Sequence, residues 1–119
     1  MRFQYENLEI WQLAIDLVEI IYKLTSKFPP EEKFGLTSQA RRASFSVPLN
    51  IAEGVGRHSK KDCANFLNYS IASLHELDTN LKIAIRLNYL NINDPELALA
   101  NQLIEKIYFK TIAYRKRLL

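Results

Sequence analysis

The chain has 119 residues, a length typical of one compact domain, and its 48% apolar and 24% charged residues are ordinary for a globular protein. Only three glycines and four prolines occur, which is few for an all-β protein with many tight turns. The formal net charge is only +3, but the cations concentrate around residues 41–42, 57–61 and 115–117, a pattern that permits contact with nucleic acid or forms an ordinary solvated surface.

A first helix is predicted from about Asn7 to Lys27, and it carries two apolar stripes. One stripe follows the alternating spacing of three and four residues that one helix face requires: Ile10, Leu13, Leu17, Ile20 and Leu24. The stripe beside it consists of Trp11, Ala14, Ile15, Val18, Ile21 and Tyr22, of which Trp11, Ile15, Val18 and Tyr22 are the candidate interface residues. Because a helix packed once against a core needs a single apolar face, we expect the second stripe to lie in an oligomer interface. Deep burial within one protomer is the alternative.

Pro29 and Pro30 end this helix, and a second helix is predicted to begin near residues 35–37. Its apolar stripe includes several small residues, which allow close approach of a neighbouring helix. Gly54 and Gly56 are expected to end it. Pro48 lies inside the helical pattern, where its ring crowds a carbonyl, so the helix should bend there or end one turn early.

The third helix is predicted to begin after Ser59, which has the character of an N-cap, and to run to about Tyr89. The segment "NINDP" breaks the pattern. Asp94 as N-cap and Pro95 at the first helical position then open a fourth helix that reaches the C-terminus. Four long helices with short connections predict an all-α fold, an antiparallel up-down-up-down four-helix bundle, as a single domain over residues 1–119.

The cellular location is predicted from cysteine usage and apolar runs. Cys63 is the only cysteine, so an intrachain disulfide is excluded and a reducing compartment fits. The N-terminus lacks the apolar core of a signal peptide, and no apolar run approaches the ~20 residues that span a bilayer. We therefore expect a cytoplasmic protein without a membrane partner.

The stretch "VPLNIAEGVGRHSKKD" at residues 47–62 contains two glycines and a basic cluster, yet it lacks the spacing of a phosphate-binding loop. Asn50, Glu53 and Arg57 have the spacing of one helix face. We interpret Asn50 and Glu53, with Glu76 of the third helix, as a structural polar network that fixes helix register. Glu76 is expected to pair with Arg41 or Arg42 across helices.

Catalytic chemistry, a cofactor and a metal site are not expected. His58 and His75 are 17 residues apart, unlike the close pair of a helical zinc site. Cys63 falls in an apolar seam and is interpreted as a core residue. Glu53 and Glu76 are the only residues on which an enzymatic alternative would rest, and no second acid or base is paired with them in the sequence.

The cations are the strongest functional lead, because phosphate contacts depend on lysine and arginine side chains. The candidate residues for binding nucleic acid are Arg41, Arg42, Arg57, Lys60, Lys61, Lys110, Arg115, Lys116 and Arg117.

Three segments of the chain resemble the family of 23S rRNA-intervening sequence proteins, which are bacterial four-helix bundles. They are "YENLEIWQLAIDLV" near the N-terminus, the specific element "SVPLNIAEGVGR", and "SLHEL" in the third helix. Asn50, Glu53, Gly54 and Arg57 match the family element "NIAEG..R". Ser73 and Glu76 match "GS..EL", although Ala72 stands where glycine is usual, so helix spacing there is expected to differ.

The resemblance implies a homopentamer of four-helix bundles, because the similar accessory protein of diversity-generating retroelements forms a basic pentameric barrel. That protein binds nucleic acid and a reverse transcriptase. The family offers no catalytic residues to transfer. We therefore expect a non-enzymatic homo-oligomer that binds RNA or DNA through basic residues. The alternative is an adaptor whose partner is another protein, such as a polymerase or a reverse transcriptase.

Overall fold

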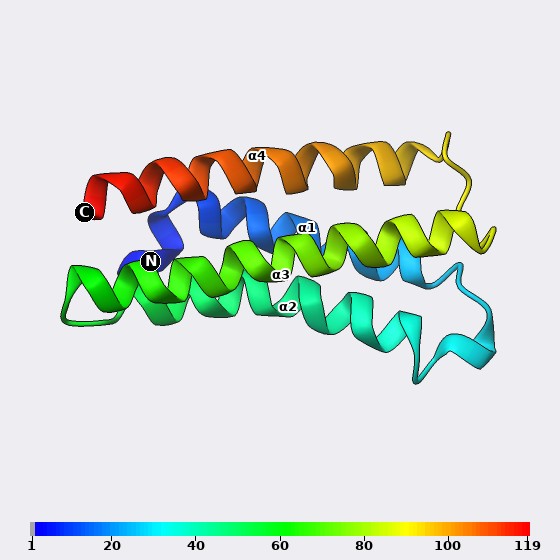
Figure 1. The fold of residues 1–119 in the computed structure, drawn as a ribbon, viewed down its shortest axis with the longest axis horizontal. Coiled ribbons are helices and arrows are strands. Elements are labelled where there is room, and N and C mark those ends of the chain that lie inside the picture. Colours follow the sequence, from blue (N-terminus) through cyan, green and yellow to red (C-terminus); the bar gives the residue numbers. More distant parts are fainter. Residues whose placement is uncertain (1) are drawn as a thin grey trace.

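The computed structural model of the chain describes residues 2–119 and contains four long helices in antiparallel order (Figure 1). The helices are α1 (Glu9–Thr25), α2 (Leu36–Val55), α3 (Lys60–Arg86) and α4 (Pro95–Leu118). Short 3-10 turns, η1 (Gln4–Asn7) and η2 (Pro30–Glu32), precede α1 and α2. The predicted all-α up-down-up-down bundle is confirmed.

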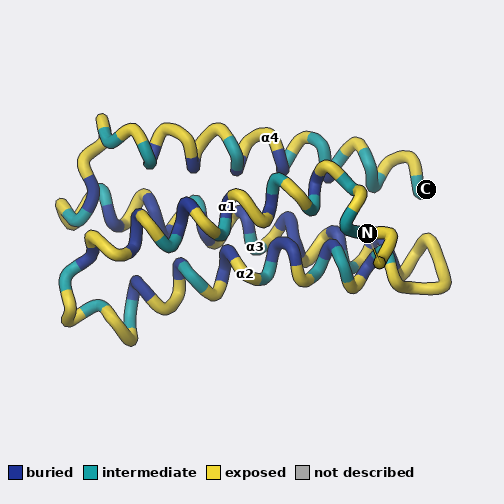
Figure 2. The backbone as a smooth tube through the Cα atoms, turned by 180° about the vertical axis from the view of Figure 1, so that it is seen from behind, coloured by how far each residue is buried: buried dark blue, intermediate teal, exposed yellow. Residues whose placement is uncertain are grey.

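The bundle is a rod of 44 × 25 × 25 Å whose long axis follows the helices. Its core lies along the centre, where each helix turns a buried stripe inward (Figure 2). The α1 stripe predicted from the spacing of three and four residues is buried apart from Leu13, which is partly buried against the core. Cys63 also lies in this core, as predicted. In the part of the chain that is described, no helix is both long and apolar enough to cross a membrane.

The helix starts follow the predicted caps. Ser59 Oγ accepts a 3.0 Å hydrogen bond from the Asp62 amide at the start of α3. Asp94 Oδ1 accepts bonds from the amides of Glu96 and Leu97, and Pro95 occupies the first turn of α4. These side chains satisfy amides that the first helical turn leaves without a backbone partner.

Three predicted boundaries were too wide. The helix α1 begins at Glu9 and ends at Thr25, inside the predicted limits of Asn7 and Lys27. Residues Gln4–Asn7 form the 3-10 turn η1 and not the first turn of α1. The helix α3 ends at Arg86, three residues before the predicted Tyr89, because Asn88 adopts a left-handed conformation with φ 66°. The Tyr89 amide then donates a 2.8 Å bond back to the Ala84 carbonyl, as in a helix C-cap built around a left-handed residue.

Pro48 does not end α2, which continues to Val55. Termination one turn early was therefore wrong, while a bend at Pro48 stays a prediction. The side of α2 that faces α3 carries small residues, and the two helices lie close together. A Cβ atom added to Gly54 would lie only 3.0 Å from Phe66 Cβ and 3.1 Å from the Cys63 carbonyl oxygen. Gly54 is therefore required for the approach of α3.

Candidate nucleic-acid interface and apolar groove

One end of the rod is rich in cations from segments distant in sequence. The connection between α2 and α3 lies at the same end as the last turn of α4 and the N-terminus (Figure 1). Six of the nine candidate cations lie in these segments: Arg57, Lys60, Lys61, Arg115, Lys116 and Arg117. We call this group the basic end.

Most of the basic end is free of acidic partners. Among the six cations of this end, only Arg57 forms an ion pair within residues 2–119: its Nη2 lies 2.8 Å from Glu53 Oε1 on the preceding turn. Arg115 donates a hydrogen bond to Asn68 on α3, which holds the end of α4 against that helix. The other four cations are exposed side chains beside the start of α3 and the end of α4. The three cations that end α4 also oppose the negative end of its dipole, a structural role that needs no ligand.

The remaining three candidate cations, Arg41, Arg42 and Lys110, lie outside the basic end. Arg41 is half-buried, since its Nε donates a 2.8 Å bond to Thr25 Oγ1 and its guanidinium lies 4.4 Å from the centre of the Tyr22 ring. Arg42 is exposed on the first half of α2. Lys110 lies 2.9 Å from Glu9, and this bond lowers the pKa of the Glu9 carboxyl.

The predicted polar network does not form. Asn50 Nδ2 donates a 2.8 Å bond to the Ser46 carbonyl of its own helix, and Glu53 pairs with Arg57 near the surface. Glu76 is exposed, and Arg41 bonds to Thr25 in place of the expected acidic partner. The spacing placed these residues on helix faces correctly. Those faces point to solvent and to their own backbone, so no register-fixing contact across helices results.

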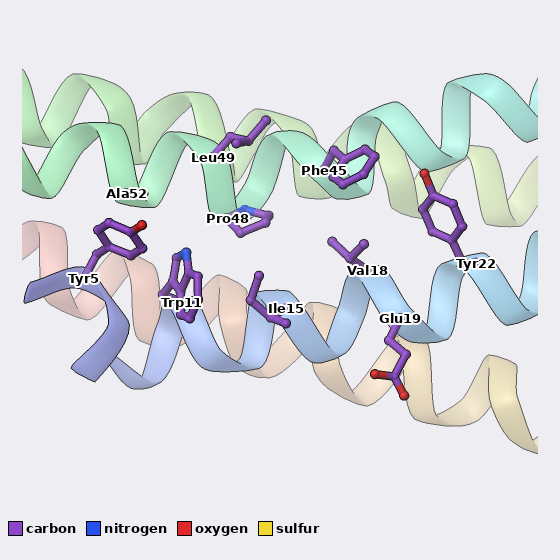
Figure 3. A pocket seen from close by; sticks show the side chains of 10 residues that line it. All are labelled: Tyr5, Trp11, Ile15, Val18, Glu19, Tyr22, Phe45, Pro48, Leu49 and Ala52. Carbon is purple, nitrogen blue, oxygen red and sulfur yellow. The ribbon is translucent and has the colours of Figure 1, made fainter. Parts of the chain in front are cut away.

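An apolar groove of about 540 Å³ runs between α1 and α2 along the side of the rod (Figure 3). Its lining residues are Tyr5, Trp11, Ile15, Val18, Glu19, Tyr22, Phe45, Pro48, Leu49 and Ala52. All four residues predicted for an oligomer interface are among them. The second stripe of α1 is divided: Ala14 and Ile21 are buried in the core of the protomer, whereas Ile15 is 41% exposed along the groove. Deep internal burial therefore holds for part of the stripe only.

The half of the groove that α2 supplies was not predicted. Phe45, Pro48, Leu49 and Ala52 follow one another at spacings of three, one and three residues, a helical stripe that was present in the sequence. Phe45 and Leu49 stay 47% and 65% exposed on the rim. Pro48 was interpreted only as a source of bending, whereas its ring also forms the floor between the two helices (Figure 3).

The two helices of the groove carry opposite charge. The helix α1 contains three acidic residues, Glu9, Asp16 and Glu19, and one basic residue, Lys23. The helix α2 contains two basic residues and one acidic residue. A partner surface that contacts both helices binds most favourably when it places basic groups opposite α1 and acidic groups opposite α2.

The histidines and the cysteine show no reactive arrangement. His75 packs against the Tyr108 ring, with 5.5 Å between ring centres, and burial raises the pKa of the Cys63 thiol. A thiol with a raised pKa is a poor nucleophile at neutral pH. Residues 2–119 contain no cluster of three histidine, cysteine, aspartate or glutamate side chains arranged to hold a metal ion.

Comparison with known proteins places the chain in a family. A crystal structure of a protein of unknown function from the S23 ribosomal protein family of Bacteroides thetaiotaomicron VPI-5482 is similar in fold, with a TM-score of 0.80 and 23% sequence identity. The similarity covers 90% of this chain and 98% of that one. No curated protein matches the chain. The sequence profile of the 23S rRNA-intervening sequence proteins matches residues 6–110, and the chain therefore belongs to that family.

Proposed function

We propose that this protein is a non-enzymatic homo-oligomer of five copies that binds RNA or DNA through the basic end. The observation that carries the proposal is the meeting of six cations from distant segments, only one of which has an acidic partner within residues 2–119. The number of copies follows from the resemblance to the retroelement accessory protein.

Phosphate contacts from these cations would be largely independent of base sequence and would weaken as salt is added. One protomer offers few such contacts. A ring of protomers repeats them, and linked weak sites bind with a combined affinity above that of any single site. Self-association is therefore part of the binding mechanism that we propose.

The groove supports self-association, and we assign its occupant as a second copy of the chain. In a head-to-tail contact, the acidic α1 of one copy meets the basic α2 of the next, so the opposite charges of the two helices attract. Contacts of this kind use two different surfaces, and they form a ring when the rotation from one copy to the next closes. Because the groove runs along the side of the rod, filling it leaves the cations at its end accessible to nucleic acid.

A fluorescently labelled RNA titrated across a salt series tests the proposal, with solution mass measured by light scattering. We expect an oligomer whose RNA affinity falls as salt rises. Reversing Arg115, Lys116 and Arg117 to glutamate should weaken binding and reduce the salt slope. The matched control reverses three exposed cations remote from the basic end, Lys33, Lys82 and Arg86. The proposal is contradicted if both variants lose the same amount of RNA affinity, or if the wild-type protein binds no RNA at low salt.

The second candidate function is an adaptor, and the groove favours it as well. Its apolar lining suits an amphipathic helix of another protein, such as a polymerase or a reverse transcriptase. A monomer in light scattering that binds no RNA, yet retains a protein partner after nuclease treatment, would select the adaptor.

A further inference from the structure

Aromatic rings stand beside the cations of the basic end. On α3, Phe66 and Tyr69 pack edge to face with 5.4 Å between ring centres. The Arg57 guanidinium lies 4.4 Å from the centre of the Phe66 ring, and Tyr69 is 55% exposed. These rings follow Lys60 by six and nine residues, which is about 9–14 Å along the helix.

The N-terminal segment reaches the same end of the rod (Figure 1), and it carries a second aromatic pair. The rings of Phe3 and Tyr5 stack with 5.7 Å between centres and an angle of 8° between planes. The Arg2 guanidinium lies 4.9 Å from the centre of the Phe3 ring, which is 48% exposed. Tyr5 lies beside Ala52 in the groove (Figure 3), so the two aromatic pairs flank the last turns of α2.

Exposed rings next to cations suit one form of nucleic acid. Unpaired bases stack on aromatic side chains while nearby cations hold the phosphates, and this stacking requires little sequence preference. In a duplex the base faces are already stacked on one another, so flat protein rings gain no contact there. Guanidinium groups placed over rings extend the stacking surface.

We propose that the basic end binds single-stranded nucleic acid, with unpaired bases stacked on Tyr69 and Phe3. The inference rests on the proposed function and specifies its ligand. Phosphates would lie along the lysines at the start of α3 and the arginines at the end of α4. The rings select single strands over duplexes, while the cations supply most of the affinity.

The selection is tested with a labelled 20-nucleotide oligo(dT), the matching oligo(rU) and a 20-base-pair DNA duplex, all at one ionic strength. Neither oligonucleotide folds on itself, so each presents unpaired bases. We expect the tighter of the two single strands to bind at least tenfold more strongly than the duplex. Whether that strand is oligo(rU) or oligo(dT) assigns the ligand to RNA or to DNA, and either assignment supports the proposal.

The rings are tested by the double variant Tyr69→Ala and Phe3→Ala, which keeps every charge. Stacking of one base contributes about a factor of ten in affinity. We expect the double variant to bind the single strand at least tenfold more weakly, with the same salt slope and the same duplex affinity. The matched control is Phe34→Ala at the opposite end of the rod. Phe34 is 89% exposed and lies 5.4 Å from the Lys33 ammonium, yet it is remote from the basic end.

The outcomes separate this inference from the function on which it rests. Duplex binding as tight as single-strand binding overturns the inference and leaves nucleic-acid binding intact. The same holds if the double variant matches wild type or loses no more than Phe34→Ala. Absence of binding to all three probes overturns both proposals. The preference of the wild-type protein for single strands remains a test even if the double variant does not fold.

Discussion

The Ser70 hydroxyl of α3 donates a 2.9 Å hydrogen bond to the Val47 carbonyl of α2, directly before Pro48. Ser70 is fully buried, and the bond joins two helices at the middle of the bundle. Ser70→Ala should lower the free energy of unfolding by about 1 kcal/mol, the usual net value of one such bond. Urea unfolding measures it. Ser73→Ala is the control, because Ser73 bonds only to its own helix, and a larger loss there would contradict the prediction.

Gly54 controls how closely α2 and α3 approach. Gly54→Ala places a methyl group against Phe66 Cβ and the Cys63 carbonyl, and the latter is backbone that cannot rotate away. Overpacking of this kind costs about 1–3 kcal/mol, which outweighs the roughly 1 kcal/mol that alanine gains over glycine in a helix. We expect a lower melting temperature by calorimetry.

Gly56 provides the matched control for that substitution. It has φ −78°, which alanine adopts readily, and an added Cβ would lie no closer than 3.6 Å to another atom. Gly56→Ala should leave stability unchanged or raise it by about 0.4–1 kcal/mol. If both substitutions shift the melting temperature equally, close helix approach is not the reason for Gly54.

Lys27 joins the end of α1 to the start of α4. Its ammonium lies 2.6 Å from Asp94 Oδ2 and 2.7 Å from Glu96 Oε1. The hydrogen bond from Lys27 lowers the pKa of the Asp94 carboxyl. An acid with a lowered pKa in the folded state contributes stability above its unfolded pKa and loses it as the pH falls through the folded value.

Lys27→Met should therefore lower the free energy of unfolding at pH 7 by up to about 1 kcal/mol. The difference from wild type should shrink as the pH falls below about 4, the ordinary pKa of aspartate. Denaturant unfolding at pH 7, 4 and 2.5 measures this trend. Lys23→Met is the control, since Lys23 is well exposed and 3.6 Å from Glu19. A difference that grows toward acid pH would show that the ion pair is not its source.

If the groove is the interface between copies of the protein, a charged residue in its lining should prevent self-association. Ile15→Asp introduces a charge into the apolar lining and should convert the oligomer to a monomer by light scattering, because burying an unpaired carboxylate is costly. Ile83→Asp on α3 is matched in residue type and in exposure, 43% against 41% for Ile15, but lies outside the groove. Dissociation by Ile83→Asp alone would place the interface elsewhere.

Periodicity and caps in the sequence were sufficient for the fold, because each helix carries its own buried stripe and its own end signals. The left-handed Asn88 had no such signal, since asparagine occurs in many other conformations. Contacts between helices were harder to predict. The spacing of Glu53 and Arg57 placed both on one face, but only the packing of α3 shows that Arg57 also covers Phe66.

The apolar groove could likewise be predicted only in part, because one of its walls follows from the sequence of α1 and the complete groove depends on the packing of α1 against α2. The excess stripe of α1 indicated that something must cover Trp11 and Ile15. It did not indicate that α2 would line the opposite wall with Phe45 and Leu49, because the rotation of one helix against another depends on side chains from both. Each aromatic pair lies within one segment of the chain, but its position beside cations from other segments depends on the same packing.

The positions of the chain ends have a practical consequence. Both the N-terminus and the C-terminus lie at the basic end (Figure 1), so an affinity tag fused to either one would lie over the cations and the aromatic rings. A polyhistidine tag in particular would bring its own positive charge at mildly acidic pH. Tags are better inserted in the connection between α1 and α2, which lies at the opposite end of the rod.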